Sequence, residues 1–336
     1  MTGWPLAPRD DWRSALMLVA VTVAACTGKY VRSTTTEAVQ ATPDRVARGA
    51  YVVNHLAACG ACHTTRDSGK IIDPERGDAL LAGGNVLETV KPQMRVWVPN
   101  ITSEPETGIG RWSDDQVMRA IRDGVDDEGK FLLPVMPFGS FRYMSDDDVR
   151  AVVAYLRSVP PLRQTHEPIK NEVPFFVRIG LNWFGAAMHR PARGVAAPST
   201  SDGVNYGEYL ARLATCADCH SLGTRGPRDP GDRFRAGSDV PFPEGGQVWA
   251  PNITPDAETG IGRCSREQVK RAMREGARLD GRKMAPPMAT LVPHYSGMTD
   301  GDLDALVAYL FAQKPVKHSV PARKLDPATR ARLGQE

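Results

Sequence analysis

Two short segments of this 336-residue chain repeat one arrangement of cysteine and histidine. The first, "CGACH", runs from Cys59 to His63, and the second, "CADCH", runs from Cys216 to His220. In both, two cysteines stand three positions apart and a histidine follows the second directly. Four of the six cysteines are used in this way, so the chemistry of this pattern limits the possible folds more than any other feature.

The adjoining histidine distinguishes among the known uses of a Cys-x-x-Cys pair. Without it, the pair could form disulfides, a redox dithiol or half of a zinc site. Cys-x-x-Cys-His is the attachment pattern for a c-type haem, in which both thiols bond to haem vinyl groups and the imidazole binds iron. We therefore expect two covalently bound haem c groups, with structural zinc or disulfides as the alternative. The expected attachment residues are Cys59, Cys62, Cys216 and Cys219, and the expected iron ligands are His63 and His220.

A longer internal repeat surrounds the two motifs. "VWVPNIT" (Val96–Thr102) returns as "VWAPNIT" (Val248–Thr254), and "ETGIGRW" (Glu106–Trp112) returns as "ETGIGRC" (Glu258–Cys264). Self-similarity of this kind indicates tandem structural units. Each unit spans about 120 residues, which buries little core unless a large apolar ligand such as haem lies at its centre.

Helical patterns occur at three places in each unit. The first helix leads into the cysteine motif, the second begins at Ser113 or Ser265, and the third begins at Ser145 or Thr299. Loops rich in glycine and proline separate these helices, and no convincing strand pattern appears. The sequence therefore predicts an all-α, loop-rich fold of two tandem cytochrome c-like domains, each with about three main helices around one haem.

One methionine in each unit is the candidate for the second iron ligand. Met136 and Met288 both stand 26 residues after the second glycine of the repeated "TGIG" segment, and both follow a loop that contains proline. A thioether is a soft, neutral donor that raises the potential of a haem relative to a second imidazole. We expect Met136 and Met288 to bind the two irons. The alternative is that both fill the core, and Met284 and Met298 are the local rivals of Met288.

Other residues have simpler expected roles. Trp97 and Trp249 share one register of the repeat and are expected to pack against haem, with ordinary core packing as the alternative. Cys264 stands where the first unit has Trp112, so we expect a small buried apolar residue and not a reactive thiol. The remaining histidines have no counterpart in the other unit. His55 is expected to have a surface or packing role on the helix before the first motif, and four others are expected in loops or the linker and not as iron ligands: His166, His189, His294 and His318.

The N-terminal segment has the pattern of an export signal. Residues 14–25, "SALMLVAVTVAA", form an uncharged apolar stretch behind Arg9 and Arg13 that is too short to cross a bilayer comfortably. The following "VAAC" resembles the site at which bacterial lipoproteins are cleaved and acylated on cysteine, here Cys26. We expect a periplasmic protein tethered to the membrane by a lipid anchor on Cys26. Simple secretion and an uncleaved anchor are the alternatives.

Composition argues against a nucleic-acid or nucleotide partner. The formal net charge is only +3, and no basic stripe, P-loop or dinucleotide-binding glycine pattern appears. The expected boundaries follow from the repeat: signal peptide 1–25, tether 26–42, cytochrome c domain 43–160, linker with a short apolar helix 161–200, second cytochrome c domain 201–318, and tail 319–336.

The combined motifs resemble a known family. The two haem motifs, the "PNIT…TGIGR" block and the methionine loops are similar to the cytochrome c subunits of bacterial membrane-bound alcohol and gluconate-type dehydrogenases. They also resemble the dihaem cytochromes that accompany periplasmic molybdenum hydroxylases. The resemblance covers residues 43–317 and departs from the family pattern at Cys264, where tryptophan is usual. It implies a periplasmic dehydrogenase as electron donor and another cytochrome or a terminal oxidase as acceptor.

Electron transfer without bond chemistry is the function that these expectations favour. Two irons held between histidine and methionine would pass electrons, and the chain itself would not be an enzyme. The first alternative is a dihaem peroxidase or another haem enzyme, which needs an exchangeable iron position near acid–base groups. The second is a haem-based gas sensor.

Overall fold

The computed structural model describes residues 35–36, 38–70, 73–90, 93–163, 174–177, 180, 194–221, 236–238, 241–242, 245–278 and 280–334. The expected signal peptide with Cys26, most of the expected linker helix, and His166 and His189 lie outside them. Within the described stretches, no helix is both long and apolar enough to span a bilayer.

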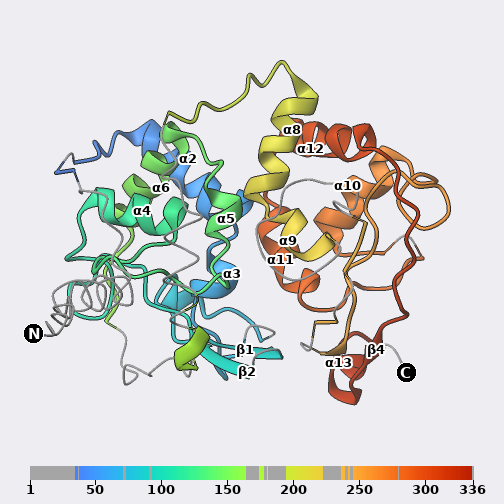
Figure 1. The fold of residues 1–336 in the computed structure, drawn as a ribbon, viewed down its shortest axis with the longest axis horizontal. Coiled ribbons are helices and arrows are strands. Elements are labelled where there is room, and N and C mark those ends of the chain that lie inside the picture. Colours follow the sequence, from blue (N-terminus) through green and yellow to red (C-terminus); the bar gives the residue numbers. More distant parts are fainter. Residues whose placement is uncertain are drawn as a thin grey trace, which may run out of the picture.

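Two helical units lie side by side, the first coloured blue to green and the second yellow to red (Figure 1). The first contains α2 (Pro43–Tyr51), α3 (Gly60–His63), α4 (Asp114–Asp123), α5 (Phe138–Phe141) and α6 (Asp146–Ser158). The second contains α8 (Gly203–Leu213), α9 (Cys216–His220), α10 (Arg266–Glu275), α11 (Met288–Tyr295) and α12 (Asp300–Ala312), and α13 (Pro327–Arg332) follows it. One continuous hydrophobic core runs through both units. The predicted all-α fold with two units is confirmed.

The first and last long helices of each unit cross at a glycine. A Cβ atom on Gly49 of α2 would lie 1.9 Å from the carbonyl oxygen of Ala151 in α6. A Cβ atom on Gly207 of α8 would lie 1.9 Å from the carbonyl oxygen of Ala305 in α12. Both distances are far shorter than any allowed contact, so only glycine lets the two backbones approach this closely. These crossings hold together the helices around which each unit is built.

The long helices begin where the capping signals predict. Ser113 caps α4 and Ser265 caps α10, each in a reciprocal capping box with the glutamine three residues later. Ser145 caps α6 and Thr299 caps α12, and each side chain accepts a hydrogen bond from the backbone N–H three residues later. The predicted starts of these helices are therefore confirmed.

The first unit has one extra residue before its cysteine motif. Cys59 lies ten positions after Gly49, whereas Cys216 lies nine positions after Gly207. A π-helical turn, Val52–Leu56, follows α2 in the first unit. Because a π turn holds one more residue than an α turn, it takes up the extra residue without shifting the glycine crossing or the motif.

Two short antiparallel ribbons were not predicted from the sequence. β1 (Val86–Val90) pairs with β2 (Gln93–Trp97), with Val86 opposite Trp97. β3 (Gly246–Gln247) pairs with β4 (Lys324–Leu325). β1, β2 and β4 lie in the lower part of the view in Figure 1, where α13 also lies. A 3₁₀ turn at Gly77–Ala79 precedes the first ribbon.

The two units contact each other through reciprocal tyrosine–aspartate hydrogen bonds. The Tyr51 hydroxyl of α2 donates to Asp302 Oδ2 of α12 at 2.6 Å and accepts from the backbone N–H of the residue that caps α12, at 3.0 Å. The Tyr209 hydroxyl of α8 donates to Asp148 Oδ2 of α6 at 2.5 Å and accepts from the cap of α6 at 3.1 Å. Each unit therefore completes the N-terminus of the last long helix of the other unit.

Replacing Tyr51 with phenylalanine should weaken this contact measurably. Burial and the hydrogen bond to Asp302 raise the pKa of Tyr51, so the phenol stays protonated and donates. Tyr51→Phe leaves the buried Asp302 carboxylate without this donor, and we expect the free energy of unfolding to fall by about 1–3 kcal/mol. Denaturant unfolding of the holoprotein measures the loss. Tyr143→Phe, at a tyrosine that is 44% exposed, is the control, and an equal loss in both variants would contradict the assignment.

Candidate haem-binding sites

Both cysteine motifs begin after a backbone turn of the same unusual conformation. Ala58 and Thr215, the residues before the first cysteine of each motif, have φ angles of 47° and 52°. This left-handed region costs a residue other than glycine roughly 1–3 kcal/mol. In both units this left-handed residue ends the path of the first long helix. The short helices α3 and α9, which carry the motifs, follow it.

The motif histidines are held by proline carbonyl groups. Nδ1 of His63 lies 2.8 Å from the carbonyl oxygen of Pro99, and Nδ1 of His220 lies 2.8 Å from that of Pro251. A carbonyl oxygen only accepts hydrogen bonds, so Nδ1 carries the proton in each ring. For His63 this leaves Nε2 as the unprotonated nitrogen, the tautomer that a metal ligand requires. Neither proline was expected to hold a histidine, although each opens the repeated "PNIT" segment.

Burial keeps the first motif neutral. Desolvation lowers the pKa of His63, against the opposing effect of its hydrogen bond to Pro99. Burial raises the pKa of the Cys59 thiol to about 12, and that of the Cys62 thiol to about 11. A redox dithiol needs a lowered thiol pKa. The electrostatics of Cys59 and Cys62 therefore disfavour a redox dithiol, and a neutral imidazole suits iron binding.

The segment after each proline is tied to the end of the last helix. The side-chain oxygen of Asn100 accepts from the backbone N–H of Thr102 at 2.9 Å, and its amide nitrogen donates to the carbonyl of Leu162 at 2.7 Å. Asn252 makes the same bonds in the second unit, with the carbonyl of Val316 at 2.7 Å. The loop that positions each motif histidine is therefore fixed to the chain leaving α6 or α12.

The candidate methionines lie in equivalent loops. Met136 precedes α5, and Met288 is the first residue of α11. Both are partly buried and pack against the continuous core, as do Cys59 and Cys216. Two more residues separate Met288 from the start of α12 than separate Met136 from the start of α6, and α11 is correspondingly longer than α5. The units therefore share a register from the proline segment to the methionine and differ after it.

The rival methionines occupy other positions. The backbone N–H of Met284 bonds to the carbonyl of Gly276 at 2.8 Å, as that of Leu132 bonds to the carbonyl of Gly124 at 2.7 Å. Met284 therefore matches a leucine and not Met136. Met298 is 3% exposed and belongs to the hydrophobic core, next to the cap of α12.

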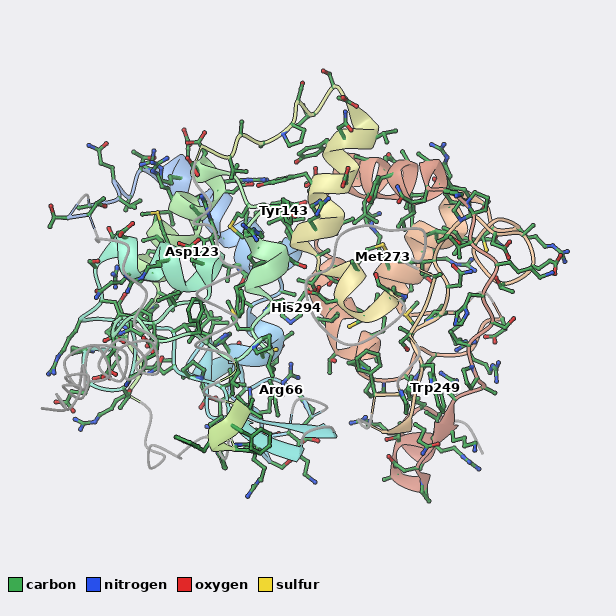
Figure 2. The ribbon with its side chains drawn as sticks, viewed as in Figure 1. Arg66, Asp123, Tyr143, Trp249, Met273 and His294 are labelled. Atoms are coloured by element: carbon green, nitrogen blue, oxygen red, sulfur yellow. The ribbon has the colours of Figure 1, made fainter. Side chains whose placement is uncertain are left out.

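The two tryptophans flank the same proline segments. Trp97 ends β2, two residues before Pro99, and the Arg95 guanidinium lies 5.0 Å from its ring centre. Trp249 lies two residues before Pro251, near the foot of the second unit in Figure 2. Both are partly buried, and contact with haem remains a prediction for both. Cys264 is partly buried against the core, like Trp112 in the first unit, as expected.

Two histidines link the units, which the sequence did not predict. His294 of α11 is only 9% exposed and lies where the units meet (Figure 2). Its Nδ1 donates to the carbonyl of Asn54 at 2.9 Å, and its Nε2 lies 2.9 Å from Glu75 Oε1. Nδ1 of His55 donates to the carbonyl of His294 at 3.0 Å. α11 therefore begins at Met288 in the second unit and reaches the first unit at His294. The His294 ring lies beside Gly60 of the first cysteine motif.

Comparison with known proteins agrees with this geometry. The Cytochrome c family profile matches residues 46–160 and 204–314. The fructose dehydrogenase cytochrome subunit of Gluconobacter japonicus is 30% identical over 308 residues, which cover 90% of this chain and 58% of that protein. The cytochrome c subunit of the quinone alcohol dehydrogenase of Gluconacetobacter polyoxogenes is 31% identical, covering 86% of this chain and 61% of that subunit. The chain thus spans less than two thirds of these two relatives.

A diheme cytochrome c-type protein of Cereibacter sphaeroides is matched over most of its own length. It is 30% identical over 265 residues, which cover 75% of this chain and 80% of that protein. The two matched regions each contain one cysteine motif, and the expectation of two covalently bound haem c groups is confirmed. This chain belongs to the cytochrome c family, with two cytochrome c domains in tandem.

Proposed function

We propose that this chain is an electron-transfer dihaem cytochrome c that receives electrons from a periplasmic dehydrogenase and passes them to another cytochrome or a terminal oxidase. The observation that carries the proposal is the pair of motif histidines, each held at 2.8 Å by a proline carbonyl in the same backbone setting. The names of the relatives support a dehydrogenase as donor, because they are cytochrome subunits of fructose and alcohol dehydrogenases.

The proposed roles follow the repeat. The cysteines of each motif attach the haem, His63 and His220 bind iron on one side, and Met136 and Met288 bind it on the other. Each bound haem supplies an iron that exchanges one electron between its ferric and ferrous states. The carbonyls of Pro99 and Pro251 fix the imidazole rings, and the core packing of the methionines limits their motion. A ligand set that stays fixed keeps the geometry similar in both oxidation states, which favours electron transfer over substrate binding.

The proposed location is the periplasm, with a lipid on Cys26 as a membrane tether. This part rests on the sequence alone, from the apolar stretch 14–25 and the "VAAC" that ends at Cys26. Labelling of the exported protein with a radioactive fatty acid, with Cys26→Ser as control, tests the tether. Label that persists in the control variant contradicts it.

Spectroscopy and redox titration of the holoprotein test the proposed function. We expect two low-spin haems that titrate reversibly, with no turnover of peroxide. High-spin ferric iron together with peroxide turnover would favour a haem enzyme, because catalysis requires an exchangeable iron position.

Met136→His and Met288→His should each lower the potential of one haem and leave the other nearly unchanged. Imidazole stabilises ferric iron relative to a thioether, and axial ligands move haem potentials within a range of about 0.8 V. Spectroelectrochemical titration resolves the two haems. Met284→His is the matched control, since Met284 takes the place of Leu132 in the loop. A titration in which Met288→His and Met284→His behave alike removes Met288 from the ligand set.

A further inference from the structure

We propose that the loop before Met288 is the docking surface for an acidic electron-transfer protein, and that the equivalent loop before Met136 is not. The cationic surface comprises Arg278, Arg282, Lys283 and Arg323. The inference rests on the proposed electron-transfer function, and it names the kind of partner that the second unit meets.

The two loops are closed by equivalent backbone bridges. In the first unit, Val125 bridges to Phe131, and in the second, Ala277 bridges to Lys283. Each bridge closes a tight turn with a glycine in the left-handed region, Gly129 in one and Gly281 in the other. The difference between the loops therefore lies in their side chains.

The side chains reverse the sign of the charge. Residues 126–131, "DDEGKF", carry three carboxylates and one ammonium, for a net charge of −2. Residues 278–283, "RLDGRK", carry three cations and one carboxylate, for a net charge of +2. Arg323 adds a further positive charge to the second loop, because its guanidinium donates to the carbonyl of Lys283 at 3.0 Å.

The arginines of the second loop are crowded around a single carboxylate. Nε of Arg278 lies 3.4 Å from Asp280 Oδ2, and Nη2 of Arg282 lies 2.5 Å from the same oxygen. The hydrogen bond from Arg282 lowers the pKa of Asp280 to about 2. Burial and the charges of Arg278 and Arg282 lower the pKa of Arg323. Like charges held this close repel one another, and carboxylates from a partner would relieve that repulsion.

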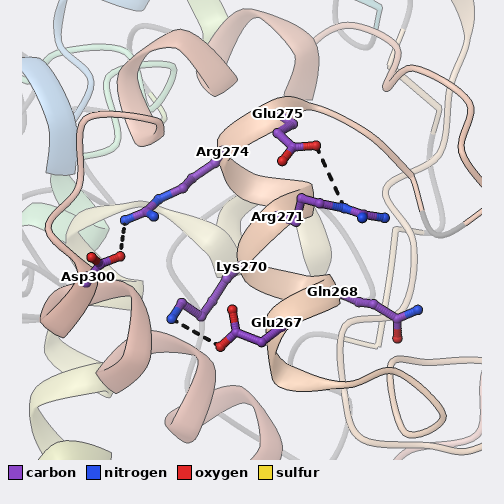
Figure 3. A pocket seen from close by; sticks show the side chains of 7 residues that line it. All are labelled: Glu267, Gln268, Lys270, Arg271, Arg274, Glu275 and Asp300. Atoms are coloured by element: carbon purple, nitrogen blue, oxygen red, sulfur yellow. Dashed lines mark hydrogen bonds and ion pairs between the residues drawn. The ribbon is translucent and has the colours of Figure 1, made fainter.

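This excess of positive charge is not general on the second unit. The surface hollow along α10 also contains arginine and lysine, but these pair with neighbouring carboxylates (Figure 3). Arg274 lies 2.6 Å from Asp300, and Lys270 lies 3.3 Å from Glu267. By contrast, Arg278 and Arg282 share one aspartate. Carboxylates of an acidic protein would therefore be attracted more strongly to the cationic surface than to the hollow along α10.

The cationic surface adjoins the proposed methionine ligand. The bond from Met284 N–H to the carbonyl of Gly276 closes the loop, and the chain reaches Met288 four residues later. A protein docked on Arg282 and Lys283 would therefore lie beside the loop that carries Met288. The first unit presents an acidic loop before Met136, which would repel the same acidic partner.

Reduction of the holoprotein by a plant-type ferredoxin, a soluble donor with an acidic surface, tests the proposal in a stopped-flow experiment. We expect Arg282→Glu/Lys283→Glu to lower the second-order rate constant about tenfold at low ionic strength. The wild-type rate constant should fall as salt is added, whereas that of the variant should not. The matched control, Lys70→Glu/Arg76→Glu, makes the same change in net charge at exposed residues of the first unit and should leave the rate constant nearly unchanged.

Reversing the other loop gives a gain-of-function test. Asp127→Lys/Glu128→Lys makes the first loop cationic at two exposed positions, and we expect the rate constant with ferredoxin to rise severalfold. Equal rate constants for the wild type and Arg282→Glu/Lys283→Glu would overturn the proposal. So would binding to phosphatidylglycerol vesicles that depends on Arg282 and Lys283 without any effect on ferredoxin, because the surface would then serve a membrane. Reversible reduction by dithionite and reoxidation by ferricyanide are measured in every variant, and their loss would instead count against the proposed function.

Discussion

Replacing Cys216 and Cys219 with serine is expected to reduce the number of covalently bound haem groups from two to one. Serine hydroxyls do not form the thioether bonds that attach a c-type haem, and the second motif has no other cysteine within it. A haem stain on a denaturing gel and the intact mass of the protein, matured in a host that exports and attaches haem, measure the change. The first unit should keep its own low-spin spectrum.

Matched variants make this result specific. Cys264→Ser removes a partly buried thiol outside both motifs, and it should leave two attached haems. Cys59→Ser/Cys62→Ser should also leave one haem, and the fourfold variant should leave none. If Cys216→Ser/Cys219→Ser still holds two haems after denaturation, the proposed attachment residues are wrong.

The second large effect is expected at the helix crossing of the second unit. A Cβ atom at position 207 would lie 1.9 Å from the carbonyl oxygen of Ala305 and 2.8 Å from Cβ of Tyr309. Gly207→Val therefore forces α8 away from α12 and should lower the free energy of unfolding by about 4 kcal/mol or more. Denaturant unfolding followed by circular dichroism and by haem absorbance measures the loss.

Gly203→Ala is the control for this prediction, because it lies in the same helix and a Cβ atom there meets nothing within 4 Å. Its effect should stay within about 0.5 kcal/mol. Gly49→Val should repeat the large loss in the first unit, where Ala151 takes the place of Ala305. A Gly207→Val protein as stable as Gly203→Ala would show that the crossing is looser than the structure indicates.

Features that depend on local sequence were predicted well. The caps of α4 and α10 follow from a serine with a glutamine three residues later, since both partners lie within one helical turn. The two-unit organisation followed from the repeat, because equivalent residues make equivalent bonds. Asn100 and Asn252 are an example.

Features that depend on distant contacts could not be predicted from the sequence. β1 does not alternate between apolar and polar residues, so the period-2 pattern that marks a strand is missing, although Val86 pairs with Trp97 of β2. The partners of His294, Asn54 and Glu75, lie more than 200 positions away along the chain. The roles of Pro99 and Pro251 could not be predicted because a backbone carbonyl group leaves no mark in a residue pattern, although both prolines recur at the start of the repeated "PNIT" segment.

The reciprocal bonds of Tyr51 and Tyr209 have an evolutionary consequence. Each unit offers both halves of a self-complementary patch, a tyrosine on its first helix and an aspartate at the start of its last long helix. Two copies of a single-haem ancestor could pair through such a patch as a symmetric homodimer. Gene fusion would then join two partners already in place, and the linker would be able to diverge without changing how the halves meet. A separated half is accordingly expected to self-associate.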